Sequence, residues 1–142
     1  MCEALRNTNN FKFECLLDVI NLAITSMGKR LVKYSICNPS CDPEEIDFRY
    51  NCIEEILTLK MEEDVKQYLS PIADIQKLSK ELRLNSICPR DLGLLVESFV
   101  IIINLRKLIS KNTKFNRKYI PTNETIHLIS DFIKDTKKYI YF

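Results

Sequence analysis

Apolar residues recur at three- and four-residue steps along most of the chain, and this is the spacing that one buried face of an α-helix requires. The first such run covers residues 11–33, where seven apolar side chains from Leu16 to Leu31 keep the helical spacing. Together the runs predict an all-α protein. The further helices are expected over residues 42–60, 62–69, 70–82 and 89–109, with a last one beginning near Thr122 or Asn123.

The run over residues 89–109 differs from the others because it is apolar on nearly every face. A helix that is apolar all round belongs in the interior of a domain. We therefore predict a compact single-domain array of five to six helices around this central segment, with residues 11–140 as the domain and residues 1–10 as an N-terminal extension. The most apolar part, residues 92–103, is shorter than the ~18 residues that span a bilayer.

Several helix starts carry recognisable signals. Asp42 can act as an N-cap, Pro43 suits a first turn, and Glu45 can complete a capping box. Ser70-Pro71 has the same form, and Pro89 suits the start of the central helix. With only two glycines in the chain, there is little material for tight hairpin turns, which again favours helices.

The net charge of +2 is small, but the charge is unevenly distributed. Residues 42–64 hold nine acidic side chains against two basic ones, whereas residues 106–142 hold nine Lys or Arg against three acids. The sequence thus predicts an acidic region and a basic end. Solvated helix faces explain this distribution, and a nucleic-acid contact at the basic end is the alternative.

Six cysteines and one histidine, His127, are the residues that could hold a transition metal. Cys37 and Cys41 have metal-like spacing, but no second pair of ligands follows, so we expect no metal and no cofactor. The first ten residues lack the pattern of a secretory signal. We therefore expect reduced thiols and an intracellular protein.

No phosphate-binding loop, nucleophile elbow or metalloprotease helix is present. His127 has no orienting partner in the sequence, and the adjacent acids at 44–45, 54–55 and 62–63 do not face one another on a helix. The sequence therefore favours a binding module over an enzyme.

Three stretches share a pattern with a known helical domain: residues 52–56 with Leu59, then Ile75, Leu78 and 82–84, and finally 124–126 with 129–134. They resemble the helical domain of the transcription elongation family. This family includes the N-terminal domain of elongation factor TFIIS and the integrase-binding domain of lens epithelium-derived growth factor. The resemblance implies a nuclear adaptor that binds short disordered peptides of transcription and chromatin proteins.

The same resemblance implies a partner-binding site made by two inter-helix loops. It assigns Cys41, Asp42 and Glu45 to the first loop, and Arg83, Leu84 and Ile87 to the second. Structural roles remain open for these residues: Asp42 can simply cap a helix, while Leu84 and Ile87 can cover the core.

Two other functions remain open. A viral Bcl-family-like regulator would also be helical and would bind a partner helix in a groove. The segment Asn104-Leu105-Arg106 echoes that family's conserved turn only in part, because this chain contains no tryptophan. A nucleic-acid binder or an enzyme that uses the basic C-terminal end is the second alternative.

Overall fold

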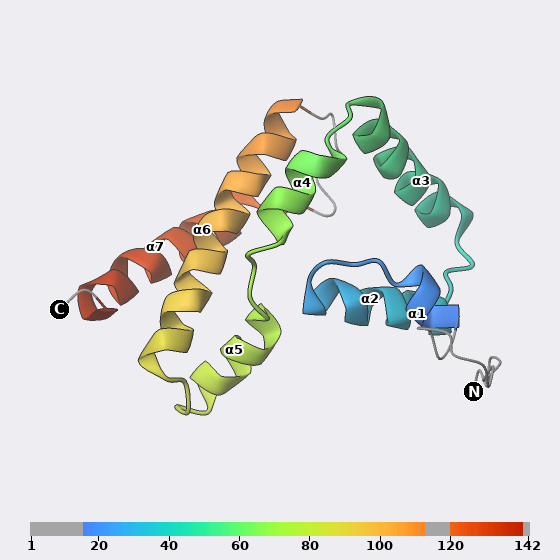
Figure 1. Ribbon diagram of the computed structural model, residues 1–142. Helices are drawn as coiled ribbons and strands as arrows, with labels where there is room; N and C mark the ends of the chain where they lie inside the picture. Colours follow the sequence, from blue (N-terminus) through green and yellow to red (C-terminus); the bar gives the residue numbers. More distant parts are fainter. Residues whose placement is uncertain (1–15, 113–119, 141–142) are drawn as a thin grey trace.

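The computed structural model describes residues 16–112 and 120–140, and every regular element in these residues is a helix (Figure 1). The all-α prediction is therefore confirmed. The predicted extension at 1–10 and the first residues of the first predicted helix lie outside the described residues. The helices are α1 (Leu16–Ile20), α2 (Ser26–Cys37), α3 (Pro43–Thr58), α4 (Glu62–Leu69), α5 (Ile75–Arg83), α6 (Pro89–Asn112) and α7 (Asn123–Ile140).

The first predicted helix is in fact two, and the prediction of one continuous helix over 11–33 is wrong. The chain leaves the helical conformation after α1, and Thr25 caps α2 by accepting the N–H of Gly28 at 3.0 Å. Glycine suits this position, since a Cβ on residue 28 would lie 2.9 Å from Thr25 Oγ1. The apolar spacing continues through the break, so periodicity alone did not reveal it. Helix α2 also runs beyond the predicted end, to Cys37.

The start of α3 agrees with its sequence signal, and its end is set by the backbone. Asp42 is the N-cap and Pro43 is the first helical residue. At the other end, Lys60 takes a positive φ of 52°. There the N–H of Lys60 donates to Leu57 O, and that of Met61 donates to Ile56 O. This pair of bonds is the Schellman motif, which satisfies the last carbonyls of a helix and turns the chain toward α4.

The predicted cap at Ser70-Pro71 is wrong. Ser70 is the C-cap of α4, and α5 begins only at Ile75 with Asp74 as its N-cap. The Asp74 carboxylate accepts the N–H of Lys77 at 3.1 Å. Residues 71–74 thus form a non-helical connection instead of a first helical turn, and the local Ser-Pro signal did not distinguish the two.

Helix α6 is central, as predicted, and extends to Asn112. It packs extensively against α4, α5 and α7. The buried apolar residues are Met61, Leu78, Leu95, Val96 and Ile133, and Leu95 is only 1% exposed. Around α6, the body of the molecule therefore has a small, continuous core.

Two polar side chains are buried in this core, and both are hydrogen-bonded. Ser98 donates to Leu94 O and accepts the N–H of Ala73, so α6 holds the connection that precedes α5. Thr136 of α7 donates to its own helix, at Phe132 O. The rings of Phe99 and Phe132 meet edge to face at 5.7 Å, which joins α6 to α7.

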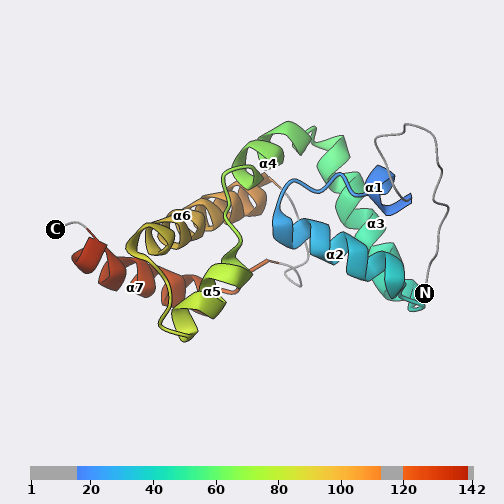
Figure 2. The ribbon, with the colours of Figure 1, turned by 60° about the horizontal axis from the view of Figure 1, so that its bottom comes forward.

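The helices form two groups. Figures 1 and 2 show α1, α2 and α3 on one side of the molecule and α4 to α7 on the other. We call the first group, residues 16–58, the N-terminal arm and the second, residues 61–140, the helical body. The chain passes between them at the turn around Lys60. Within the described residues, no helix is long and apolar enough to cross a membrane.

The core around α6 can be tested with two neighbouring leucines. Leu95→Ala should lower the free energy of unfolding by about 2–5 kcal/mol, because it leaves a cavity at a site that is 1% exposed. Leu94→Ala is the matched control, since Leu94 is 40% exposed on the same helix. It should change stability by only about 0.5 kcal/mol. Urea unfolding followed by circular dichroism measures both, and equal losses would contradict this assignment of the core.

Candidate functional site

The first predicted loop serves the start of α3. Asp42 Oδ1 accepts the backbone N–H two residues further on at 3.1 Å, which gives Asp42 the capping role that the sequence allowed. Glu45 accepts from the Ser40 hydroxyl at 3.1 Å and pairs with Arg49 at 2.6 Å. Cys41 is exposed.

The second predicted loop lies at the far end of the helical body. Arg83 ends α5 and Leu84 is 65% exposed, whereas Ile87 is half-buried. In Figures 1 and 2 the α5–α6 connection and the α2–α3 connection lie at opposite ends of the molecule. The structure therefore does not bring the two predicted loops together, and the partner-binding role of these six residues stays a prediction.

The N-terminal arm has a surface that sequence reasoning misinterpreted. Its helices contain no buried residue. The periodicity of 11–33 and 42–60 predicts core faces, but many of these side chains are exposed to solvent. The exposed large apolar residues of the arm and the turn after it are Leu16, Val19, Ile20, Leu22, Ile24, Leu31, Tyr34, Ile36, Tyr50, Ile53, Leu57 and Leu59.

The helical body has few such residues. Among the described residues of the body, the exposed large apolar side chains are Leu84, Leu94, Val100 and Leu128. Scattered apolar residues on a surface need no explanation, but a concentration of them marks a surface that binds something. The exposed apolar surface of the N-terminal arm is thus the candidate functional site. Such a surface can bind by packing against another apolar surface.

One ion pair fastens the N-terminal arm to the helical body. Arg30 of α2 meets Asp74 through two parallel contacts, Nη1 to Oδ2 at 2.7 Å and Nη2 to Oδ1 at 2.8 Å. Gln76 Oε1 accepts from the same guanidinium at 2.6 Å and 3.2 Å. Such a bidentate arrangement fixes direction as well as distance. We call Arg30, Asp74 and Gln76 the clamp.

The clamp also changes the protonation of its members. The hydrogen bonds from Arg30 lower the pKa of Asp74 to about 2, and the backbone N–H of Lys77 acts in the same direction, while partial desolvation opposes both. The hydrogen bond to Asp74 raises the pKa of Arg30. Asp74 is therefore ionised throughout the neutral and mildly acidic range.

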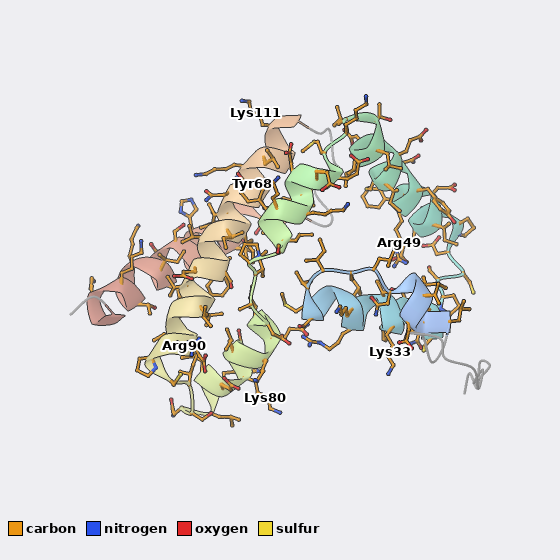
Figure 3. All side chains as sticks on the ribbon, in the orientation of Figure 1. Lys33, Arg49, Tyr68, Lys80, Arg90 and Lys111 are labelled. Carbon is orange, nitrogen blue, oxygen red and sulfur yellow. The ribbon has the colours of Figure 1, made fainter. Side chains whose placement is uncertain are left out.

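The predicted basic end is partly neutralised by its own helix. On α7, Lys134 pairs with Asp131 and Lys138 pairs with Asp135. Figure 3 shows Lys111 near one end of α6 and Arg90 at the other, so cations are spread over both ends of the body. Of the described cations from residue 106 onward, Arg106, Lys107, Lys111 and Lys137 make no ion pair within the described residues. Arg106 Nη2 donates instead to the side-chain amide oxygen of Asn123 at 2.6 Å.

Groups that could perform chemistry are dispersed. His127 is exposed on α7. The described cysteines Cys37, Cys41, Cys52 and Cys88 are free thiols. Burial, together with the charge of Glu55, raises the pKa of Cys52, which disfavours its nucleophilic thiolate. Within residues 16–112 and 120–140, no three His, Cys, Asp or Glu side chains gather as metal ligands would.

Comparison with known sequences indicates a family for this chain. The model of the family described as MutS domain III matches residues 3–140. A DNA mismatch repair protein MutS of Thermotoga sp. strain RQ2 is 31% identical over 121 residues, which are 84% of this chain and 15% of that protein.

Two further relatives carry the same name. The protein of Petrotoga mobilis is 32% identical over 74% of this chain and 13% of its own length. The protein of Thermotoga maritima is 30% identical over 84% of this chain and 15% of its own length. The chain thus spans about 15% of the length of such relatives. No solved structure matches it.

These matches correct the function expected from the sequence. The resemblance to the transcription elongation family is wrong, because the MutS domain III match covers nearly the whole chain. The peptide-binding adaptor of transcription and chromatin proteins and the viral Bcl-family-like regulator are wrong for the same reason. Apolar helical spacing supplied most of the supposed resemblance, and any all-α protein shares such spacing.

The clamp gives a prediction with a defined pH window. Asp74→Asn keeps a side chain that can cap α5 but removes the negative charge that holds Arg30. We expect this variant to be less stable than the original chain at pH 7. The folded pKa of about 2 lies below the unfolded value of about 3.9, so the stabilisation is present above pH 4 and is lost as the pH falls toward 2.

Urea unfolding at a series of pH values measures this difference. Asp131→Asn is the matched control, because Asp131 is 67% exposed and its pair with Lys134 lies within one helix. The effect of Asp131→Asn should be smaller than that of Asp74→Asn at pH 7. A stability difference for Asp74→Asn that persists unchanged down to pH 2 would show that the ion pair is not its cause.

Proposed function

We propose that this chain, which belongs to the MutS domain III family, acts in DNA mismatch repair as a helical domain of a MutS-type protein. The observation that carries the proposal is the family match over residues 3–140. The relatives that cover most of the chain are named as DNA mismatch repair proteins.

The structure supports a role in packing for this domain. A domain that works alone buries the apolar faces of its helices, since apolar surface contributes about 25 cal/mol per Å² when it leaves water. Here the helical body does so and the N-terminal arm does not. An arm of this kind suits a domain that is completed by neighbouring parts of a larger protein, and the relatives are several times longer than the matched segment.

We further propose that the domain supplies no catalytic group. Among the described residues, the thiols and the exposed His127 lack the mutual contacts that a nucleophile and its base require. Repair of DNA implies an intracellular location, which was expected from the sequence. The nuclear location rested on the transcription family, and nothing in the comparisons supports it.

DNA is the partner that the proposed function implies. Direct contact through the basic end is the finer hypothesis, and it rests on Lys107, Lys111 and Lys137, the lysines of that end without an ion pair in the described residues. If these lysines contact phosphates, reversing their charge should weaken DNA binding and flatten its salt dependence. If other parts of the MutS-type protein make the contacts, the same change should have little effect.

A domain exchange tests the proposed function. Residues 3–140 of this chain would replace the matching segment of the Thermotoga sp. strain RQ2 protein. We expect the chimaera to bind a duplex with a single mismatch more tightly than the fully paired duplex, as measured by fluorescence anisotropy. The comparison is a chimaera that carries an unrelated helical bundle of similar length, which should lose this preference.

The Leu95→Ala and Leu94→Ala substitutions provide a control for folding within the chimaera. Only Leu95→Ala should impair folding of the chimaera, because Leu95 lies in the core and Leu94 does not. A chimaera that is folded and monodisperse, yet no better than the unrelated bundle at distinguishing the two duplexes, would refute the proposed function.

A further inference from the structure

One face of α3 carries a continuous apolar stripe. Ile46, Tyr50, Ile53 and Leu57 follow one another at steps of four, three and four residues, so they lie in a single row along the helix. This is the spacing with which one helix packs along another in a coiled coil. At 1.5 Å per residue the row is roughly 17 Å long, enough to contact three turns of a second helix. We call these four residues the α3 stripe.

Within the described residues the α3 stripe is largely uncovered, although Ile46 at its start is half-buried. Tyr50 is 67% exposed, and Ile53 and Leu57 are each 54% exposed. Helix α3 contains no buried residue, and the extensive helix contacts of the described residues are those that α6 makes with α4, α5 and α7. The spacing of a helix interface is therefore present without the second helix.

The charges beside the α3 stripe indicate what the second helix carries. Asp47 and Glu54 follow Ile46 and Ile53 directly and lie on one flank of the row. The whole helix has five carboxylates against one guanidinium, that of Arg49, and Arg49 already pairs with Glu45. An acidic flank favours Lys or Arg on the facing helix. Two copies of α3 would repel each other, which disfavours a dimer through this face.

We propose that the α3 stripe binds a basic amphipathic helix from another segment of the same MutS-type protein, outside the residues of this chain. The proposal rests on the proposed function for the source of that helix. The relatives supply the room for it, since the matched segment is only 15% of the length of the Thermotoga sp. strain RQ2 protein. The clamp at Arg30 and Asp74 ties the N-terminal arm to the helical body through α2, which precedes α3 in the chain.

Binding to peptides tests the proposal on the 142-residue chain itself. The probes are overlapping 20-residue peptides that cover the Thermotoga sp. strain RQ2 protein outside its matched segment, measured by fluorescence anisotropy. We expect binding only by peptides that are amphipathic as helices and carry net positive charge, and we expect it to weaken as salt is added. Binding by acidic peptides, or by none, would overturn the proposal.

Matched variants locate the binding surface. Ile53→Asp places a charge in the middle of the α3 stripe and should weaken peptide binding at least tenfold. Leu128→Asp makes the same change at a residue of α7 that is 72% exposed, and it should leave binding unaltered. Both residues are exposed, so circular dichroism should show the same helix content in each variant. Equal binding by the two variants would exclude the α3 stripe as the site.

Two further outcomes separate this proposal from its alternatives. Sedimentation that shows a dimer of the chain, lost in Ile53→Asp, would identify a second copy as the occupant and overturn the proposal. A chimaera that discriminates mismatched DNA while the chain binds none of the peptides would overturn the inference about α3 and leave the proposed function standing. The reverse result would refute the function and retain a basic helix as the ligand of the α3 stripe.

Discussion

The arrangement of this molecule depends on a short series of polar contacts that begins in its core. Ser98 is buried on α6 and accepts the backbone N–H of Ala73. The next residue, Asp74, caps α5, and both of its carboxylate oxygens accept hydrogen bonds from Arg30 of α2. A buried hydroxyl thus fixes the connection that holds the N-terminal arm.

The two ends of this series have different physical character. In the helical body, apolar burial around Leu95 and Val96 holds the helices together. In the N-terminal arm, local hydrogen bonds set where helices begin and end: Thr25 caps α2, Asp42 caps α3, and the Schellman turn at Lys60 ends α3. Local contacts of this kind fix the direction of a helix without burying its face. The arm is accordingly ordered and still exposes its apolar side chains.

This division agrees with the proposed function, in which the chain is one domain of a larger protein. The family match covers residues 3–140, whereas the relatives are much longer than that segment. The charges agree with this division. The acidic flank of the α3 stripe faces outward, whereas most cations of α7 are paired within their own helix.

The sequence by itself determined the helical class, the central position of α6 and those helix starts whose cap and proline adjoin, as Asp42-Pro43 does. These features are local: periodicity and capping depend on residues within a few positions of one another. It did not determine the break before Thr25 or the start of α5 at Asp74. Apolar spacing continues through the break before Thr25. The position of Asp74 depends on its contact with Arg30, which lies 44 residues away in the chain.

The candidate surface shows the same limit. The row from Ile46 to Leu57 was visible as apolar spacing, but spacing tells only that a helix has an apolar face. Whether that face is covered depends on which other helices pack against it. Only the tertiary structure shows that α6 packs against α4, α5 and α7, while the α3 stripe stays largely exposed. Neither that exposure nor the distance between the two predicted loops follows from the sequence alone, because both depend on contacts between residues far apart in the chain.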